Sequence, residues 1–173
     1  MRKAKAITQT LFDTKKINVL KYRRLSIKEL EELEKEFIQF LAVNGIDAQK
    51  WQELKSSEDD EVDALIDLFS DMVMEKSLQN IQYIEHRTPT DYKIFFYDEN
   101  EAHMFGIKSQ SVNLLDEKAF DKLEERLREN TISLIKASKL YSKPREIELF
   151  ETLKNGCVVT ESKLFSLLKK LAN

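Results

Sequence analysis

The fold class is decided by the stretch Tyr92-Lys-Ile-Phe-Phe-Tyr97, which is followed by Asp98-Glu-Asn-Glu101 and Ala102–Ile107. Two runs rich in aromatic and aliphatic residues are separated by four polar residues, a pattern typical of a β-hairpin. The sequence on either side is mainly of helical period. This hairpin therefore changes an otherwise helical prediction into an α+β one.

The predicted hairpin is aromatic on both of its faces. Strand alternation divides its large side chains into two groups: Tyr92, Ile94 and Phe96, and Phe95, Tyr97 and Phe105. Since a sheet covered on one side usually keeps its other side polar, two interpretations stay open. Both faces are buried, by the chain or in a homo-oligomer, or one face binds a protein or stacked bases. Tyr92, Phe95 and Tyr97 are the candidate contact residues.

Two further strands are expected, at Ile81–His86 and at Ile132–Ala137, although the second is ambiguous between strand and helix. Helices are predicted on both sides of them. Ser26 and Glu29 form a capping-box pattern before an amphipathic helix that ends at Asn44-Gly45. Later helices are expected after Asp47, over Ser57–Gln79, from about Asp116, over Pro144–Lys154, and over Glu161–Leu171 with Thr160 as its cap.

The composition excludes several classes of protein. The 173 residues include 3 glycines and 2 prolines, about 3% together, whereas average usage would give roughly 12%. An all-β fold needs more turn residues than this, and a phosphate-binding loop needs closely spaced glycines. We therefore expect a helix-rich single α+β domain over residues 25–173, with a small antiparallel sheet of three or four strands.

The charge is unevenly distributed along the chain. The first 24 residues carry one acid and eight basic residues: Arg2, Lys3, Lys5, Lys15, Lys16, Lys21, Arg23 and Arg24. The remainder carries 20 basic and 30 acidic residues. Such a basic arm is either a solubilising extension, a segment that docks on acidic protein, or a segment that binds nucleic acid or the ribosome.

Five acids recur at steps of four in the helix predicted over Ser57–Gln79: Asp59, Asp63, Asp67, Asp71 and Glu75. Like charges at this spacing repel one another by roughly 0.2–0.5 kcal/mol per pair. The acids form either a solvated face or a docking stripe, whose occupant would be a basic partner or the protein's own basic arm.

One cluster could support chemistry. Glu85, His86 and Arg87 bring together an acid, a base and a cation, although alternation in a strand turns His86 away from the other two. They form either a small polar pocket or an ion pair beside a packed histidine. Cys157 follows a helix C-terminus, where the helix dipole opposes a thiolate, so it is expected in the core. We expect no metal site and no cofactor.

Four segments resemble an uncharacterised family of small bacterial proteins found among the Bacteroidota: Lys21–Leu25, Glu36–Ile46, Tyr83–Arg87 and Lys143–Glu146. The similarity covers roughly residues 20–170. It implies a bacterial cytosolic protein of unknown process, and it implies nothing about mechanism.

These observations favour a non-catalytic cytosolic interaction or adaptor protein. A single cysteine cannot form an internal disulfide, and no stretch approaches the 18 apolar residues of a transmembrane helix. Two alternatives remain: association with nucleic acid or the ribosome through the basic arm, and a small enzyme or ligand-binding domain centred on Glu85, His86 and Arg87.

Overall fold

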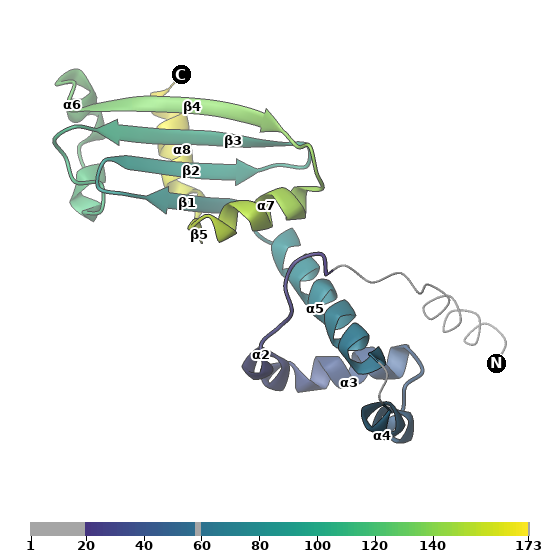
Figure 1. Cartoon of the computed structure of the whole chain (residues 1–173). Helices are drawn as coiled ribbons and strands as arrows, with labels where there is room; N and C mark the ends of the chain where they lie inside the picture. The colour runs from purple at the N-terminus through teal and green to yellow at the C-terminus, as the bar shows by residue number, and fades with distance from the viewer. Residues whose placement is uncertain (1–19, 58–59, 173) are drawn as a thin grey trace. The chain divides into compact units, whose positions relative to one another are not determined.

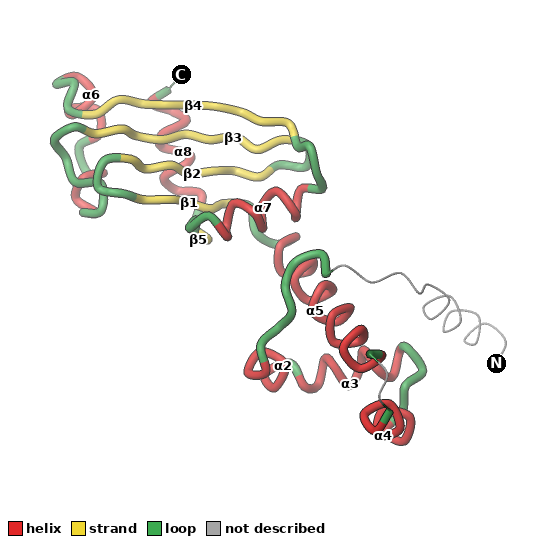
Figure 2. Tube along the Cα trace, viewed as in Figure 1, coloured by secondary structure: helices red, strands yellow, loops and turns green. Residues whose placement is uncertain are grey.

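The computed structural model describes residues 20–57 and 60–172. The chain divides into two compact units, Met1–Lys76 and Ser77–Asn173, and each is described here by itself. The first unit is helical and the second is built on an antiparallel sheet (Figure 1, Figure 2). The predicted α+β class is therefore confirmed.

The helical unit contains α2 (Ile27–Glu32), α3 (Glu34–Val43), α4 (Ala48–Ser56) and most of α5 (Glu61–Gln79). The capping box is present, because the Ser26 side chain accepts from the Glu29 N–H and Glu29 reaches back to the Ser26 N–H. The predicted first helix is broken in two at Leu33, whose ψ of 20° is not helical.

The core of the helical unit is aromatic. Phe69 of α5 is fully buried, and its ring lies 5.0 Å from that of Phe37 and 5.4 Å from that of Phe40. Trp51 of α4 packs edge-on against Phe37, with the ring centroids 5.5 Å apart. Gly45 ends α3 with φ at 74°, a backbone conformation that favours glycine.

The second unit contains a sheet of five strands in the order β4-β3-β2-β1-β5, with every neighbouring pair antiparallel. The strands are β1 (Tyr83–Arg87), β2 (Asp91–Tyr97), β3 (Glu101–Ser109), β4 (Ile132–Leu140) and β5 (Val158–Val159). The ambiguous segment after residue 131 is therefore a strand, as interpreted. The strand beyond the expected three or four is β5, whose two residues are too few to show a periodicity.

Helices pack on both faces of this sheet, to different extents. They are η1 (Glu117–Phe120), α6 (Leu123–Arg128), α7 (Arg145–Lys154) and α8 (Ser162–Leu171). Figure 1 shows α8 crossing behind the strands, whereas α7 lies in front of them beside β1. The prediction that Thr160 caps α8 is wrong, because Glu161 precedes this helix and the Thr160 hydroxyl donates instead to Glu85, 3.0 Å away.

The face behind the strands, which we call the covered face, holds the core of the sheet unit. Tyr92, Ile94 and Ile107 are fully buried there against Phe165 and Leu168 of α8. The prediction that Phe105 shares a face with Phe95 and Tyr97 is wrong. Since Phe105 pairs with Ile94 in the register of β2 and β3, it lies on the covered face, where its ring is 5.2 Å from that of Phe165.

Candidate functional site

Four of the five acids in the predicted stripe lie along α5: Asp63, Asp67, Asp71 and Glu75. Asp59 lies outside the described residues. The segment Lys21–Leu25, which we call the strap, contacts all four of them. A part of the chain that sequence analysis assigned to the basic arm is therefore packed on the acidic helix within the helical unit.

The strap is held first through its backbone. The carboxylate of Asp71 accepts from the N–H of Lys21 at 2.8 Å and from the N–H of Tyr22 at 3.0 Å. The Ser70 hydroxyl accepts from the N–H of Leu25 at 3.1 Å. Leu25 itself is buried, with 5% of its surface exposed. The strap is thus part of the core of the helical unit.

The side chains of the strap complete the neutralisation of the stripe. Arg24 donates to Asp63 at 2.8 Å and also to Asp67. Lys21 pairs with Glu75, which also accepts from the Tyr22 hydroxyl at 2.6 Å. Each repelling acid has therefore gained a donor, and the cost of placing like charges four residues apart is offset.

The ionisation of these groups reflects their contacts. Partial burial acts to raise the pKa of Glu75, but hydrogen bonds from Lys21 and Tyr22 outweigh it and lower the pKa below its ordinary value. Burial, together with the hydrogen bond to Glu75, raises the pKa of Tyr22 to about 12. Glu75 therefore stays a carboxylate, and Tyr22 stays a neutral donor to it.

The eight cations of the basic arm are only partly within the structure. Lys21 and Arg24 bind the stripe, and Arg23 donates to Glu29 at 2.9 and 2.6 Å. The other five lie outside the described residues: Arg2, Lys3, Lys5, Lys15 and Lys16. The three described cations are engaged with carboxylates of their own unit.

Glu85 is the centre of a buried polar network on the covered face. Its carboxylate, 7% exposed, accepts from Arg87 at 2.8 Å, from the Tyr92 hydroxyl at 2.9 Å and from Thr160 at 3.0 Å. The Arg87 guanidinium also lies 5.1 Å from the ring centroids of Tyr92 and Phe120. This network joins β1, β2, η1 and the turn before α8. A buried carboxylate that is paired and hydrogen-bonded in this way has a structural role.

His86 does not join Glu85 and Arg87, because strand alternation turns it to the opposite face, where it pairs in register with Lys93. Cys157 is half-buried, and burial raises the pKa of its thiol. The two cavities described for this chain are lined by other residues. The predicted pocket group is thus split, with its acid and its cation turned into a packed layer.

The structure also separates the three candidate contact residues of the hairpin, Tyr92, Phe95 and Tyr97. Tyr92 is fully buried on the covered face, where burial and the nearby Glu85 carboxylate raise the pKa of its phenol. Tyr97 is 5% exposed, and its hydroxyl lies 2.7 Å from that of Thr152 on α7. Phe95 is half-buried, and the register places it on the front face between Ile84 and Met104. Figure 1 shows α7 beside β1, which leaves the front of β2, β3 and β4 without a helix of the sheet unit.

This uncovered part, which we call the open face, is built from two rows across neighbouring strands: Phe95, Met104 and Ala137, and Lys93, Gly106 and Ile135. Phe95, Met104 and Ile135 are half-buried, and Ala137 is exposed. Gly106 is required by close packing, since a Cβ there would lie 2.5 Å from the Tyr92 carbonyl oxygen and 3.0 Å from Ile135. Because glycine has no Cβ, the side chain of Ile135 can pack over this position of β3.

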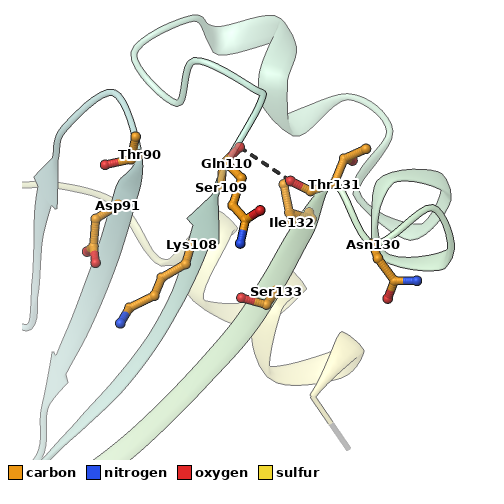
Figure 3. Close-up of a pocket in the computed structure, with 9 residues that line it drawn as sticks. All are labelled: Thr90, Asp91, Lys108, Ser109, Gln110, Asn130, Thr131, Ile132 and Ser133. Carbon is orange, nitrogen blue, oxygen red and sulfur yellow. Dashed lines mark hydrogen bonds between the residues drawn. The ribbon is translucent and has the colours of Figure 1, made fainter.

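A polar cavity of about 510 Å³ continues the open face at the end where β2 and β4 begin and β3 ends (Figure 3). Asp91, Lys108 and Ser133 contribute to it from three neighbouring strands, and loop residues such as Gln110 and Asn130 complete it. Asp91 is already paired with Lys93 at 3.0 Å. We assign no ligand to this cavity.

Arg145 explains one of the motifs that carried the family resemblance. It stands at the first position of α7 and donates to the backbone carbonyls of Leu78, Ile81 and Tyr97. The segment Lys143–Glu146 therefore ties the connection before β1 to the end of β2, which is a structural role.

Among residues 20–57 and 60–172, no group of three or more metal-ligating side chains could hold a metal ion. Within the same part of the chain, no helix combines the length and the apolarity needed to cross a membrane.

Sequence analysis did not place Met104, Ile135 and Lys108 on the same face of the sheet as Phe95. The signal was present in the alternation of β3 and β4, but it needed the correct register. Each strand can be shifted by one residue against its neighbour, which moves every side chain to the other face.

Comparison with known proteins supports the resemblance noted in the sequence, although no curated protein and no solved structure matches this chain. The match to a family pattern spans nearly the same residues as the predicted similarity. The chain belongs, over residues 20–173, to the family of unknown function DUF6495.

Proposed function

We propose that this protein is a non-catalytic protein-interaction module that binds its partner through the open face. The observation that carries the proposal is the row Phe95–Met104–Ala137, which lies across three strands with no helix of the sheet unit over it. Antiparallel sheets with one solvated face normally keep that face polar. An aromatic and a thioether side chain there are typical of contact surfaces.

The charges around this row indicate the kind of partner. Lys93, Lys108 and Lys139 all lie on the front face of the sheet, because they alternate with residues of the covered face. Asp91 and Glu148 neutralise the first and the last of them, at 3.0 and 2.6 Å. Lys108 is exposed. We expect a partner that presents apolar side chains to Phe95 and Met104 and a carboxylate to Lys108.

The acidic stripe supports this proposal by contrast. It was an equal candidate in the sequence, but the strap already occupies its four described acids. A partner at the stripe would have to displace Leu25 from the core, whereas a partner at the open face would displace no helix of the sheet unit. We further propose that the protein acts in the bacterial cytosol, since its single cysteine gives no internal disulfide.

The test is affinity capture from nuclease-treated host lysate with the full chain as bait. The variant Phe95→Ser with Met104→Ser removes the apolar centre of the open face. The matched control is Ile38→Ser with Val43→Ser, which removes two apolar side chains that are 57% and 87% exposed in the helical unit. We expect a protein retained by the native chain and by the control to be lost from the open-face variant.

Retention of the same protein by the open-face variant would contradict the proposal. A partner that disappears with nuclease treatment, or on removal of residues 1–19, which keeps the strap, would instead favour the nucleic-acid alternative. The remaining alternative is an enzyme or ligand-binding domain at Glu85, His86 and Arg87, and the register speaks against it because His86 lies on the opposite face from the other two.

A further inference from the structure

The two edges of the sheet are finished differently. At one edge β1 is followed by β5, which pairs Ile84 with Val159 and Glu85 with Val158, while the Thr160 N–H donates to the Tyr83 carbonyl at 3.1 Å. At the other edge lies β4, whose nine residues pair with β3 along their whole length. One edge is therefore closed by the chain itself.

The register shows which backbone groups β4 presents at its outer side. The Tyr141 N–H donates to the Asn100 carbonyl, so odd-numbered residues of β4 bond to β3 and even-numbered residues point outward. The outward residues are Ile132, Leu134, Lys136, Ser138 and Leu140. Among the described residues, no backbone hydrogen bond from outside the sheet is made to Leu134, Lys136 or Ser138.

The usual protections of an edge strand are missing from β4. It contains no proline, it is long, and its two lysines do not cover its backbone. Lys136 donates its Nζ to the Ala172 carbonyl at 3.3 Å, and Lys139 pairs with Glu148 at 2.6 Å. Both ammonium groups are turned back onto the sheet unit, which leaves the outward amides accessible to another strand.

The charges on β4 indicate what kind of strand would pair with its outer edge. The charged residues of β4 are two lysines, and Glu148 neutralises Lys139, so pairing in register with a second copy would bring Lys136 toward the same residue of that copy. Residues 1–19 carry five basic residues and one acid, and would be repelled in the same way. A strand that carries carboxylates is attracted instead.

We propose that β4 is a docking edge for an extended acidic segment of another protein, which adds to the sheet as a sixth strand. Outward backbone groups supply the hydrogen bonds, and alternate side chains supply the selectivity. On the covered side of β4, Leu134, Lys136 and Leu140 recur at even positions, and Leu140 is 72% exposed. The segment therefore carries a carboxylate opposite Lys136 and apolar residues opposite the two leucines.

This docking edge uses the outward backbone groups and the even-numbered side chains of β4, whereas the open face uses the odd-numbered Ile135 and Ala137, so the inference goes beyond the proposed function. The probe is a phage-displayed library of random 12-residue peptides, selected on the full chain. We expect enrichment of acidic peptides in which apolar and polar residues alternate. Enrichment of peptides without acidic residues, or no enrichment at all, would overturn the inference.

The decisive variant is Ser138→Pro, tested with the best-enriched peptide. Proline removes the outward N–H of residue 138 and leaves every hydrogen bond to β3 in place, because that N–H is not used within the sheet. The matched control is Ser138→Ala, which keeps the N–H. We expect at least about tenfold weaker peptide binding by Ser138→Pro and unchanged binding by Ser138→Ala. Equal binding by both variants would overturn strand addition.

A second measurement does not depend on the folding of the proline variant. The enriched peptide is synthesised in two forms, or phases, with N-methyl groups on its odd-numbered residues or on its even-numbered residues. In an added strand, alternate N–H groups point toward β4, so one phase blocks hydrogen bonding to β4 and the other does not. We therefore expect binding to survive in one phase alone. Loss or survival in both phases would contradict an added strand.

Two further readouts separate the acidic partner from the other occupants. Lys136→Gln should weaken binding of the acidic peptide about threefold, as expected for an exposed ion pair. A dimer in solution that Ser138→Pro converts to a monomer would identify a second copy as the occupant and would overturn the proposal. The variant Phe95→Ser with Met104→Ser should leave peptide binding unchanged, so failure of the open face and failure of the edge are distinguishable.

Discussion

The acidic stripe of α5 and the open face of the sheet are opposite cases of a surface that looks unusual in sequence. In the helical unit, four acids at steps of four are met by the strap, through Lys21, Arg24 and two backbone amides bound to Asp71. In the sheet unit, Phe95 and Met104 lie in a row that no helix of that unit covers. The first surface is occupied by a segment of its own unit, and the second is left uncovered by the helices of its own unit.

This difference teaches that an unusual pattern in the sequence does not say whether the chain itself covers the surface that carries it. A charged stripe is filled by a short segment, since each ion pair needs one side chain. An apolar sheet face needs a whole layer, which the sheet unit supplies on one side with α8 and on the other only beside β1. The following predictions test this distinction.

The largest effect is expected from two neighbouring residues of β2. Ile94→Ala should lower the free energy of unfolding by about 3 kcal/mol, because Ile94 is fully buried on the covered face. Phe95→Ala, on the open face, should lower it by about 1 kcal/mol, because its ring is only half-buried. Urea denaturation followed by far-UV circular dichroism measures both. Equal losses would show that the open face is buried.

The next effect concerns the strap. Leu25→Ala should lower the free energy of unfolding of the helical unit by about 2 kcal/mol, since this buried side chain anchors the strap. Trp51 is the single tryptophan of the chain and lies in this unit, so its fluorescence reports the transition. The control is Ile27→Ala, which removes a side chain that is 77% exposed and should change stability by less than about 0.5 kcal/mol. Similar losses from both variants would mean that the strap is not anchored.

A smaller effect is expected in acid, at the contact between α7 and β4. Hydrogen bonds from Lys139 and from the Ser142 N–H lower the pKa of Glu148 to about 2. A depressed pKa in the folded state stabilises the fold above the unfolded value, and that contribution is lost as the pH falls through the folded value.

The native chain should therefore lose about 1 kcal/mol of this contribution between roughly pH 4.5 and pH 2, the amount being limited by the exposure of Lys139. Glu148→Gln should be less stable at neutral pH and should lack that part of the acid dependence. Urea titrations at pH 6, 4 and 2.5 measure it. Parallel pH profiles for the two proteins would exclude the assignment.

The smallest effect is expected from the ion pairs of the strap. Arg24→Ala should lower the stability of the helical unit by about 0.5 kcal/mol at low salt, because its pairs with Asp63 and Asp67 are partly exposed. The difference should shrink in 1 M NaCl, where the screening length is about 3 Å. The control is Lys28→Ala, whose only described ion pair, to Glu32, is long at 4.0 Å. A loss that does not depend on salt would indicate packing of the arginine stem instead.

The fold was predictable where a pattern is local. The capping box at Ser26 and Glu29, the helix end at Gly45 and the strand at the start of β4 are confirmed, because each depends on residues a few positions apart. The break at Leu33, the two-residue β5 and the role of Thr160 were not predictable. The last two depend on contacts with residues distant in the sequence, as the pairing of β5 with β1 and the bond from Thr160 to Glu85 illustrate.

The candidate site divides in the same way. Alternation correctly separated His86 from Glu85 and Arg87, because neighbours in a strand always point to opposite faces. The grouping of Phe105 with Phe95 was wrong, because the register between β2 and β3 follows from the turn and the packing, and not from either strand alone. Met104 and Ile135 were missed for the same reason.

The sequence by itself determined the α+β class, the family, and the presence of a basic segment and an acidic stripe, because composition and period are properties of the chain. Only the tertiary structure decided that the strap fills the stripe, which faces the aromatic residues of the hairpin occupy, and which sheet edge has no partner strand within the described part of the chain. These depend on register and on contacts across many residues, and the free energy that selects them comes from burial of the assembled layers.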